Sequence, residues 1–425
     1  MLQILRNAWK IPDLRRKLLY TLLILFLFRL GNWIPVPGVD VNALKGYAEG
    51  NTLFQMMGMI SGSSMENFTL FALGISPYIT ASIIMQLLTV AIPSLGRMAK
   101  EDEDGRMKIN KITRYVAVGL GLVESFGFTM KLMNDGKLYD RHWYTFAITT
   151  IIVTAGCMLV MWMGESISQR GVGNGISLLI FVGIVSRMPQ YGSMLYSSWK
   201  DNVWMLAIIA AAFVALISII TWVDLGQRRI PVQYAKQQRG RKLYGGQTTH
   251  LPIKVNSASV LPIIFAMSFL SLPSIIGQFV GDSSRFAIFV KTYMSGTGPW
   301  AWAYVTVYML LIFGFTFFYN SITVDPKEIS KNLQQNGGFI QGIRPGKTTA
   351  EYIARVSGRL TFFCALFLMV VSIIPRLFTR QTPEMAAMSQ LFTASSVLIM
   401  VNVALETAKQ LESQMLVRNY RGFLG

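Results

Sequence analysis

The sequence predicts an all-α polytopic membrane protein with ten transmembrane helices. Hydrophobic residues make up 52% of the 425 residues, and the mean hydropathy is +0.44, which is more than a water-soluble core of this size requires. The apolar residues are collected in ten runs, and nine of these reach the roughly 17 to 25 residues that cross a bilayer. Barrel strands would show short alternating segments instead, so the runs indicate helices.

The first run follows Arg15, Arg16 and Lys17 and continues into NWIPVPG without a small-residue cleavage site, so it predicts a retained span and not a signal peptide. The fifth run is the shortest. The ten runs are residues 18–34, 68–92, 112–131, 143–164, 174–188, 203–223, 257–280, 301–321, 358–376 and 388–407.

Basic residues orient the helices. With ten spans, the side that holds both termini receives 28 of the 39 lysines and arginines, the other side receives 10, and Arg29 lies inside a span. The richer side of a membrane protein is cytoplasmic, so both termini are expected in the cytoplasm. Part of the formal charge of +18 is expected to face anionic lipids.

A long connection follows the first helix of each set of five spans, at residues 33–67 and 224–256. Two halves with an odd number of spans must be inverted relative to each other. We therefore expect two inverted pseudo-symmetric halves, residues 1–188 with spans one to five and residues 189–425 with spans six to ten.

The second run contains a stripe that is aliphatic at one end and polar at the other. Ile75, Ile79, Ser82 and Gln86 follow the i, i+4, i+7, i+11 series of one helix face. Because span two runs toward the cytoplasm, the isoleucines are expected near the middle of the membrane and the polar residues nearer the cytoplasm. This order fits a wet funnel that closes on an apolar constriction, and a polar contact between helices is the alternative.

The segment before this stripe is moderately apolar, rich in Met and Gly, and too short to span. It reads NTLFQMMGMISGSSMEN at residues 51–67, and no charge lies between Thr52 and Met65. Such a re-entrant piece is tolerated at depth only where protein or water surrounds it. We expect a removable stopper, since methionine packs without a fixed shape.

Two cytoplasmic loops, residues 224–256 and 322–357, are longer than adjacent helices need, and long ordered loops usually carry function. In the first, Ile230, Val232 and Tyr234 before QQRGRK and Leu243 and Tyr244 after it indicate a β-hairpin. We expect two basic protrusions that receive a soluble partner. Nucleic acid is one candidate, and a ribosome would satisfy that interpretation without sequence recognition.

Catalytic and cofactor motifs are absent from the sequence. GIRPGKT has Gln341 where a phosphate loop needs glycine, and GVGNG at residues 171–175 indicates a flexible turn between helices. His142 and His250 fall on opposite sides of the membrane, and Cys157 and Cys364 lie within apolar runs, so neither a metal site nor a disulfide is supported. We expect neither an enzyme nor a cofactor.

Ionisable residues inside the spans are few. Arg29 is expected to snorkel from a span end, Glu165 to lie where span four meets the cytoplasm, and Glu406 to pair with Lys409. Glu124 alone lies deep. A proton-coupled transporter would show several such groups.

Four motifs in order resemble the bacterial SecY family, whose members form the central channel subunit of the Sec protein translocase. They are FALGISPYITASIIMQLLTV, MGESISQRGVGNGIS, QRRIPVQYAKQQRGRKLYGGQTTHLPIKVN and NGGFIQGIRPGKTT, and the resemblance covers essentially the whole chain. It implies a protein-conducting channel that moves unfolded preproteins across the bacterial plasma membrane and releases apolar segments laterally into it.

The resemblance implies ten helices around a central hourglass pore whose waist is a ring of aliphatic side chains, closed by a plug. Ser268 departs from the aliphatic pattern. The implied pore ring is Ile75, Ile79, Ile180, Ile264, Ser268 and Ile399, and the implied plug residues are Phe54, Met56, Met57, Gly58, Met59, Ile60, Ser61 and Gly62.

The resemblance also implies a lateral gate and a docking surface for the cytoplasmic motor or the ribosome. The gate residues are Thr80, Ser82, Gln86, Pro262 and Phe269, and the docking residues are Arg239, Arg241, Lys242, Arg344 and Lys347. The implied partners are a SecA-type ATPase, a SecE-type small membrane subunit, a SecG-type subunit, the ribosome, signal peptides and unfolded preproteins.

Two other classes of protein remain as alternatives. A secondary transporter also uses broken helices and inverted repeats, but it needs coupling-ion ligands and no large basic docking surface. An intramembrane enzyme would need paired catalytic groups.

Overall fold

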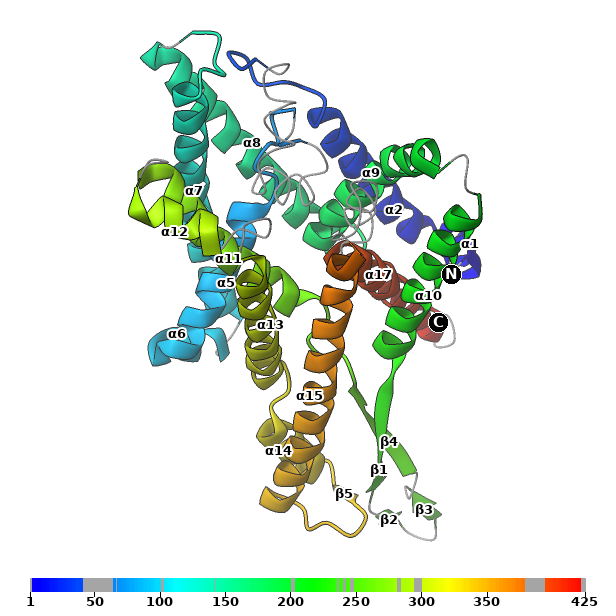
Figure 1. Cartoon of the computed structure of the whole chain (residues 1–425). Helices are drawn as coiled ribbons and strands as arrows, with labels where there is room; N and C mark the ends of the chain where they lie inside the picture. The colour runs from blue at the N-terminus through cyan, green and yellow to red at the C-terminus, as the bar shows by residue number, and fades with distance from the viewer. Residues whose placement is uncertain are drawn as a thin grey trace. The chain divides into compact units, whose positions relative to one another are not determined.

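The computed structural model of the chain describes residues 2–40, 64–65, 67–100, 103–140, 142–199, 203–234, 237–239, 242–244, 248–280, 284–293, 300–378 and 394–421. Most of these residues are helical, and a few short strands lie between α10 and α15 (Figure 1).

Each of the ten apolar runs overlaps a helix. These helices are α2 (Pro12–Gly31), α5 (Ser76–Ala91), α7 (Glu103–Asn134), α8 (Trp143–Arg170), α9 (Gly175–Trp199), α10 (Val203–Leu225), α11 (Leu261–Val280), α13 (Ala301–Thr323), α15 (Lys347–Phe378) and α17 (Ala394–Arg421). The remaining helices are α1 (Leu2–Lys10), α6 (Pro93–Lys100), α12 (Arg285–Tyr293) and α14 (Pro326–Gln335).

Four helical segments of the described chain are long and apolar enough to cross a membrane by themselves: Glu103–Asn134, Trp143–Arg170, Trp302–Gln335 and Lys347–Ile374. A fifth candidate is the pair Ser76–Ala91 and Pro93–Ala99, which bends by 108°. The proline that follows Ile92 explains the break, since a proline ring disfavours a helical residue before it. The membrane character is confirmed, and ten crossings stay a prediction.

Contacts between residues group the chain into two compact units. Unit 1 comprises Met1–Ser197, Met267–Val305 and Ile399–Gly425, and unit 2 comprises Ser198–Ala266 and Thr306–Leu398. This grouping rests on contacts and not on the direction of the helices. The inverted halves 1–188 and 189–425 therefore stay a prediction.

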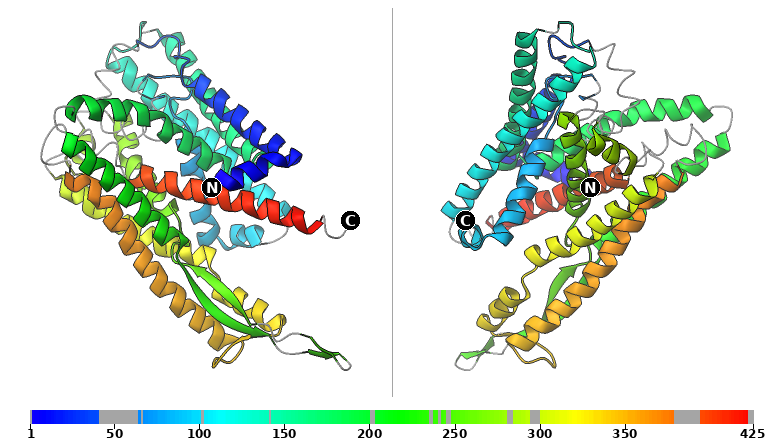
Figure 2. Two further views of the ribbon diagram at one scale, coloured as in Figure 1. Left: turned by 90° about the vertical axis from the view of Figure 1, so that its right-hand side faces the viewer. Right: turned by 60° about the vertical axis from the view of Figure 1, so that its left-hand side comes forward.

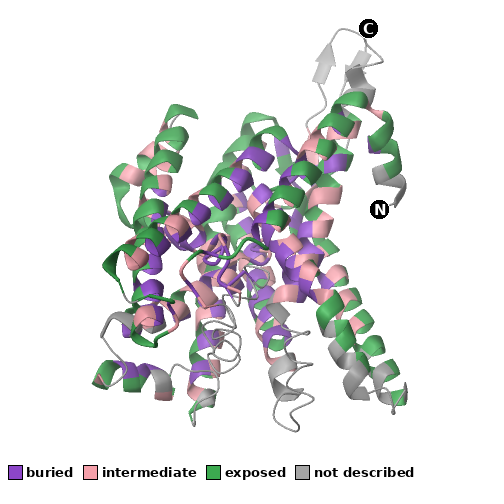
Figure 3. Cartoon of the chain, turned by 90° about the horizontal axis from the view of Figure 1, so that it is seen from above, coloured by how far each residue is buried: buried purple, intermediate pink, exposed green. Residues whose placement is uncertain are grey.

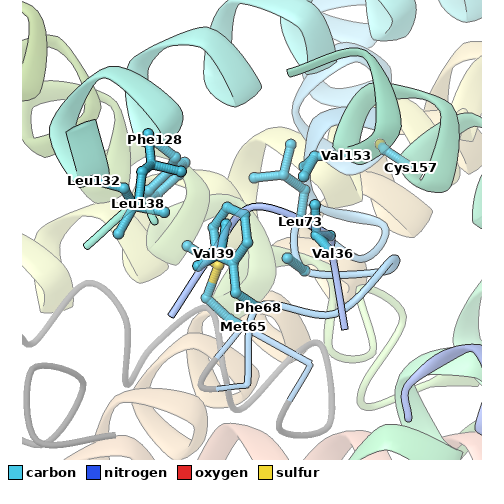
Figure 4. Close-up of a cluster of buried hydrophobic side chains, with 11 residues drawn as sticks. Val36, Val39, Met65, Phe68, Leu73, Phe128, Leu132, Leu138, Val153 and Cys157 are labelled. Carbon is cyan, nitrogen blue, oxygen red and sulfur yellow. The ribbon is translucent and has the colours of Figure 1, made fainter. Parts of the chain in front are cut away.

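The core of unit 1 lies where α7 and α8 meet the chain before α5. One apolar cluster joins side chains from all three segments, and Figure 4 shows Met65 and Phe68 close to Val39. Its buried members are Val36, Val39, Met65, Phe68, Ala72, Leu73, Phe128, Leu132, Leu138, Val153 and Cys157.

Small residues let α5, α7 and α8 approach closely. A methyl group added at Gly156 of α8 would collide with the main-chain oxygen of Leu70, and one added at Gly121 of α7 would touch Met158 and Pro77. Ala81 and Ala117 are fully buried in the same packing. Close backbone approach through glycine and alanine is the usual way in which helices associate within a membrane.

Single helices carry buried residues on one face and exposed residues on the other (Figure 3). On α2, for example, Thr21, Ile24 and Phe28 are buried, whereas Leu23 and Phe26 are exposed. Exposed aliphatic faces of this kind suit contact with lipid.

Unit 2 contains a three-stranded antiparallel sheet in the order β4–β1–β5. Strands β1 (Gln227–Tyr234), β2 (Gln237–Arg239), β3 (Lys242–Tyr244) and β4 (Thr248–Lys254) come from the first long loop, and β5 (Gly338–Ile340) comes from the second. The predicted β-hairpin is confirmed. The sequence predicted two protrusions, whereas the pairing of β1 with β5 joins both loops in one sheet.

One face of this sheet packs on α14 and α15, and Figure 2 shows the β1–β4 hairpin beside them. Ile230, Val232 and Ile340 alternate with exposed residues along their strands and meet Ile353 of α15. The side-chain period of two in a strand produces this one-sided burial.

We expect Gly156→Ala to lower the free energy of unfolding by about 1–3 kcal/mol, because the methyl group meets backbone that cannot repack. Gly119→Ala in α7 is the matched control: nothing lies within 4 Å of its added methyl group, so its stability should stay the same or rise slightly. Cys157 and Cys364 are free and buried, so a thiol-reactive dye reports thermal unfolding in detergent. Equal melting temperatures for both variants would contradict the packing described for α8.

Candidate functional site

The stripe predicted on span two is present on α5. Ile75 is the residue before the helix and is 3% exposed, and Ile79 in the first turn is 8% exposed. Ser82 and Gln86 follow on the same face and are half-buried. Along α5, buried isoleucine is therefore followed by more exposed polar residues, although Ile75 caps the helix and does not lie within it. The funnel that this stripe would line stays a prediction.

The other proposed ring residues lie on three further helices. Ile180 of α9 is 4% exposed and Ile399 of α17 is 6% exposed, whereas Ile264 and Ser268 of α11 are half-buried. Ile264 belongs to unit 2 and the others belong to unit 1. The convergence of these side chains on one axis stays a prediction.

The residues assigned to a lateral gate lie on α5 and α11. Thr80 and Pro262 are buried, and Phe269 is 49% exposed. Both helices carry proline: Pro77 is in the first turn of α5, and Pro273 lies inside α11. Pro273 removes a main-chain hydrogen bond inside α11 and makes that helix easier to bend, whereas Pro77 lies where a helix has no main-chain hydrogen bond to lose.

All eight residues assigned to the plug lie outside the described residues. The end of the predicted stopper does not: Ser64 and Met65 are fully buried. The main-chain nitrogen of Thr69 donates to the Ser64 oxygen, and that of Phe68 donates to the Met65 oxygen. Ser64 and Met65 are therefore anchored in the core of unit 1, so only residues before Ser64 are available as a removable element.

The glycine-rich turn between α8 and α9 is confirmed, but hydrogen bonds hold it in place. Thr21 of α2 accepts from the Val172 nitrogen at 3.1 Å, and Ser168 accepts from the Gly175 nitrogen at 2.9 Å. Asn174 accepts from the first nitrogens of α9. Gly173 has φ +84°, a conformation that favours glycine. The turn ties α2, α8 and α9 together, and its flexibility stays a prediction.

Charged groups near the C-terminal end of α8 are paired across helices. Arg114 of α7 donates to Glu165 of α8 at 2.8 Å, and their side chains are 44% and 18% exposed. The expectation that Glu165 lies at a span end agrees with this partial exposure. Glu406 is exposed and forms no ion pair with Lys409, both of them described, so the predicted helix-end pair is wrong.

Glu124 of α7 is the deep ionisable residue predicted from the sequence, and it is 3% exposed. Its Oε2 atom has no hydrogen-bond partner among the described residues. Arg29 lies half-buried in the last turn of α2, as a snorkelling residue would.

The residues assigned to docking lie on the sheet of unit 2 and beside it. Arg239 ends β2 and Lys242 begins β3, whereas Arg241 lies outside the described residues. Arg344 is exposed in the turn between β5 and α15, and Lys347 is exposed as the first residue of α15. The main-chain oxygen of Arg344 accepts from the hydroxyls of Thr348 and Thr349, so the turn is fixed while the Arg344 side chain is available.

Glycine shapes the same turn. Gly342 and Gly346 have φ +80° and +98°, values that a side chain would strain. Ser330 of α14 donates to the Gly346 oxygen at 2.7 Å. These bonds present Arg344 at the tip of a rigid turn, which suits recognition of a partner.

The sequence did not indicate a polar chain at the base of the sheet. Asn256 donates to Asp224 at the end of α10, and Cys364 of α15 donates to Asn256, each at 3.2 Å. This chain fixes the point where the hairpin leaves the helices. Within the described ranges, no group of three histidine, cysteine or acidic residues could hold a metal ion.

Comparison with known proteins identifies the family of this chain. Residues 69–408 match the model of the SecY family. The translocase subunit SecY of Mycobacterium bovis is 40% identical over 444 residues and that of Halalkalibacterium halodurans is 41% identical over 436 residues, with 100% of each chain covered.

Two solved structures share the fold. One is described as a protein-conducting channel, with a TM-score of 0.64 and 19% identity, and the other is Sec61 in the canine ribosome–channel complex from the endoplasmic reticulum, with a TM-score of 0.62 and 18% identity. Each alignment covers 94% of this chain and 92% of the other. The fold is that of a protein-conducting membrane channel. The chain belongs to the SecY family of protein translocase subunits.

We expect the Arg114–Glu165 pair to contribute about 0.5–1 kcal/mol of coupling, since it is partly exposed and therefore screened by water. A double-mutant cycle with Arg114→Gln and Glu165→Gln measures this coupling, and tryptophan fluorescence during denaturant unfolding in micelles supplies the free energies. Added salt should reduce this coupling free energy, because it screens a partly exposed ion pair. Strictly additive effects would contradict a bond between α7 and α8.

Proposed function

We propose that this chain is the pore subunit that conducts unfolded preproteins across the bacterial plasma membrane and releases their apolar segments laterally into it. The main support for this proposal is the sequence identity to SecY translocase subunits over the full length of the chain. The stripe on α5, which runs from buried isoleucine to polar residues, adds to it. Ten crossings in two inverted halves and cytoplasmic termini belong to the same proposal, and the distribution of basic residues supports them.

The pore would be closed at its waist by Ile75, Ile79, Ile180, Ile264 and Ile399, with Ser268 beside them. A narrow apolar ring loses its water and resists ions without a charged gate, while its smooth walls accept a polypeptide of any sequence. Burial of the isoleucines on α5, α9 and α17 supports this role.

The plug would consist of the uncharged residues 54–62, which lie before the anchor at Ser64 and Met65. A segment that is tied down at its end and free of charge satisfies two requirements of a stopper: it is able to return to its place, and it costs little to bury.

Lateral release would take place between α5 and α11, where Thr80, Ser82, Gln86, Pro262 and Phe269 lie. An apolar signal helix gains about 0.3–0.6 kcal/mol for each leucine-like residue that enters lipid. Pro273 inside α11 supports the bending of that helix.

The sheet of unit 2 with its turn at Arg344 would receive the energy source, either a SecA-type ATPase or a ribosome. The solved relatives include channels described in complex with ribosomes. Exposed Arg344 and Lys347, with Arg239, Arg241 and Lys242 of the β2–β3 segment, supply the positive charge. SecE-type and SecG-type subunits and anionic lipids would surround the helices.

Crosslinking tests the pore. Single cysteines at Ile75, Ile79 and Ile264 should form disulfides with a cysteine in a stalled preprotein, because all three would line its path. Ile151→Cys on α8, which is 67% exposed, is the control that should face lipid. The parent protein supplies the background, since its two cysteines are buried. If no ring position crosslinks, or if position 151 crosslinks equally, the proposed pore is wrong.

Charge reversal tests the docking surface. Arg344→Glu should reduce ATP-driven import into inverted vesicles at least about tenfold, the effect of losing about 1.4 kcal/mol at an interface, while the turn survives because its hydrogen bonds use main-chain oxygens. Lys108→Glu makes the same charge change at an exposed position of α7, and its import rate should stay within about twofold of the parent protein's rate. Normal import by the Arg344 variant would refute docking at this turn.

A further inference from the structure

Asn402 of α17 is a buried amide without a partner. Its side chain is 5% exposed, and neither the amide nitrogen nor the amide oxygen forms a hydrogen bond within the described part of the chain. Its neighbours Val401 and Val403 are buried and apolar. Burial of an unpaired amide costs stability, so the residue requires an explanation other than packing.

Asn402 lies close to a residue of the proposed ring, Ile399, on the same helix. Asn402 follows Ile399 by three residues, which on an α-helix is about 60° around the axis and about 4.5 Å along it. The proposed cytoplasmic C-terminus puts Asn402 on the cytoplasmic side of Ile399. Four residues further on, Glu406 is exposed, so polar residues follow the buried isoleucine along α17 as they do along α5.

The same offset recurs on two other helices. Ser82 follows Ile79 by three residues on α5, and Ser177 precedes Ile180 by three residues on α9, which in the proposed topology runs in the opposite direction. All three polar residues therefore fall one step to the cytoplasmic side of a ring isoleucine. α11 departs from this pattern, since Leu261 stands three residues before Ile264.

The two serines also lack partners. Both side chains are half-buried, and neither hydroxyl forms a hydrogen bond within the described residues, although other helical hydroxyls do. Thr150, Thr154 and Thr316, for example, donate to the main-chain oxygen four residues earlier. Ser82 and Ser177 are thus available to a group that is not part of the resting chain.

An amide side chain matches one ligand in particular. It offers both a donor and an acceptor, as does the peptide group, and serine hydroxyls also donate and accept. None of the three residues is charged, and their amide and hydroxyl groups match a neutral ligand that both donates and accepts hydrogen bonds. The backbone of an unfolded polypeptide is the neutral hydrogen-bonding group that every translocated chain has in common.

We propose that Asn402, Ser82 and Ser177 form a polar collar on the cytoplasmic side of the isoleucine ring, and that this collar hydrogen-bonds the backbone of the polypeptide in transit. The collar replaces part of the water that each peptide group loses on entering the apolar waist. This inference rests on the proposed pore function, and it assigns the main role to Asn402 because the amide offers donor and acceptor together.

Asn402→Leu tests the collar, since leucine preserves the shape and removes both polar atoms. We expect the import rate of a preprotein to fall about three- to tenfold, and the melting temperature to rise because an unpaired buried amide is lost. The fall should be similar for two preproteins of different composition, since the backbone is common to both. Ser372→Ala of α15 is the control: Ser372 is also buried and unpaired in the described part but lies outside the collar, so import should stay unchanged.

Three outcomes would overturn the collar. They are an unchanged import rate for Asn402→Leu, a loss of import accompanied by a lower melting temperature, which indicates a structural role, and an equal loss in Ser372→Ala. Crosslinking of Asn402→Cys to a stalled preprotein separates this inference from the pore itself. Crosslinks at positions 75 and 79 without one at 402 would refute the collar alone, whereas no crosslink at any of these positions would refute the pore.

Discussion

Close approach of α5, α7 and α8 is the constraint on which unit 1 depends. Gly156 lets the main chain at Leu70 lie against α8, and Gly121 lets Pro77 lie against α7. Between lipid-exposed helices the hydrophobic effect gives little attraction, because lipid is as apolar as leucine, so tight packing of small residues has to hold the helices together. The same packing fixes the start of α5, and with it the place where Ile75 and Ile79 stand.

Polar groups are arranged around that packing according to depth. Near the end of α8, Arg114 and Glu165 form an ion pair that water reaches in part. Deeper in unit 1, hydroxyls such as those of Thr150 and Thr154 return to their own helix, which satisfies them without water. Asn402 and the Oε2 atom of Glu124 follow neither rule among the described residues. Unsatisfied groups of this kind are costly in an apolar interior, and the hydroxyl of Ser372 is a further one among the described residues.

In unit 2, the sheet forms a platform beside the C-terminal end of α10 and the N-terminal end of α15. The sheet draws strands from two loops that are far apart in the sequence and packs them on α14 and α15. The chain Cys364–Asn256–Asp224 fixes the base of the platform, and the glycines around Arg344 shape its tip.

The sequence by itself determined that the ten apolar runs are helices, that α5 carries an aliphatic-to-polar stripe, and that the first long loop contains a hairpin. Each of these follows from periodicity, which is local. Only the tertiary structure decided that β5 joins β1, that Met65 belongs to a core, and that Glu165 pairs with Arg114 while Glu406 does not pair with Lys409. These outcomes depend on distances between segments far apart in the chain, and a three-residue strand or a single carboxylate carries no periodic signal that specifies its partner.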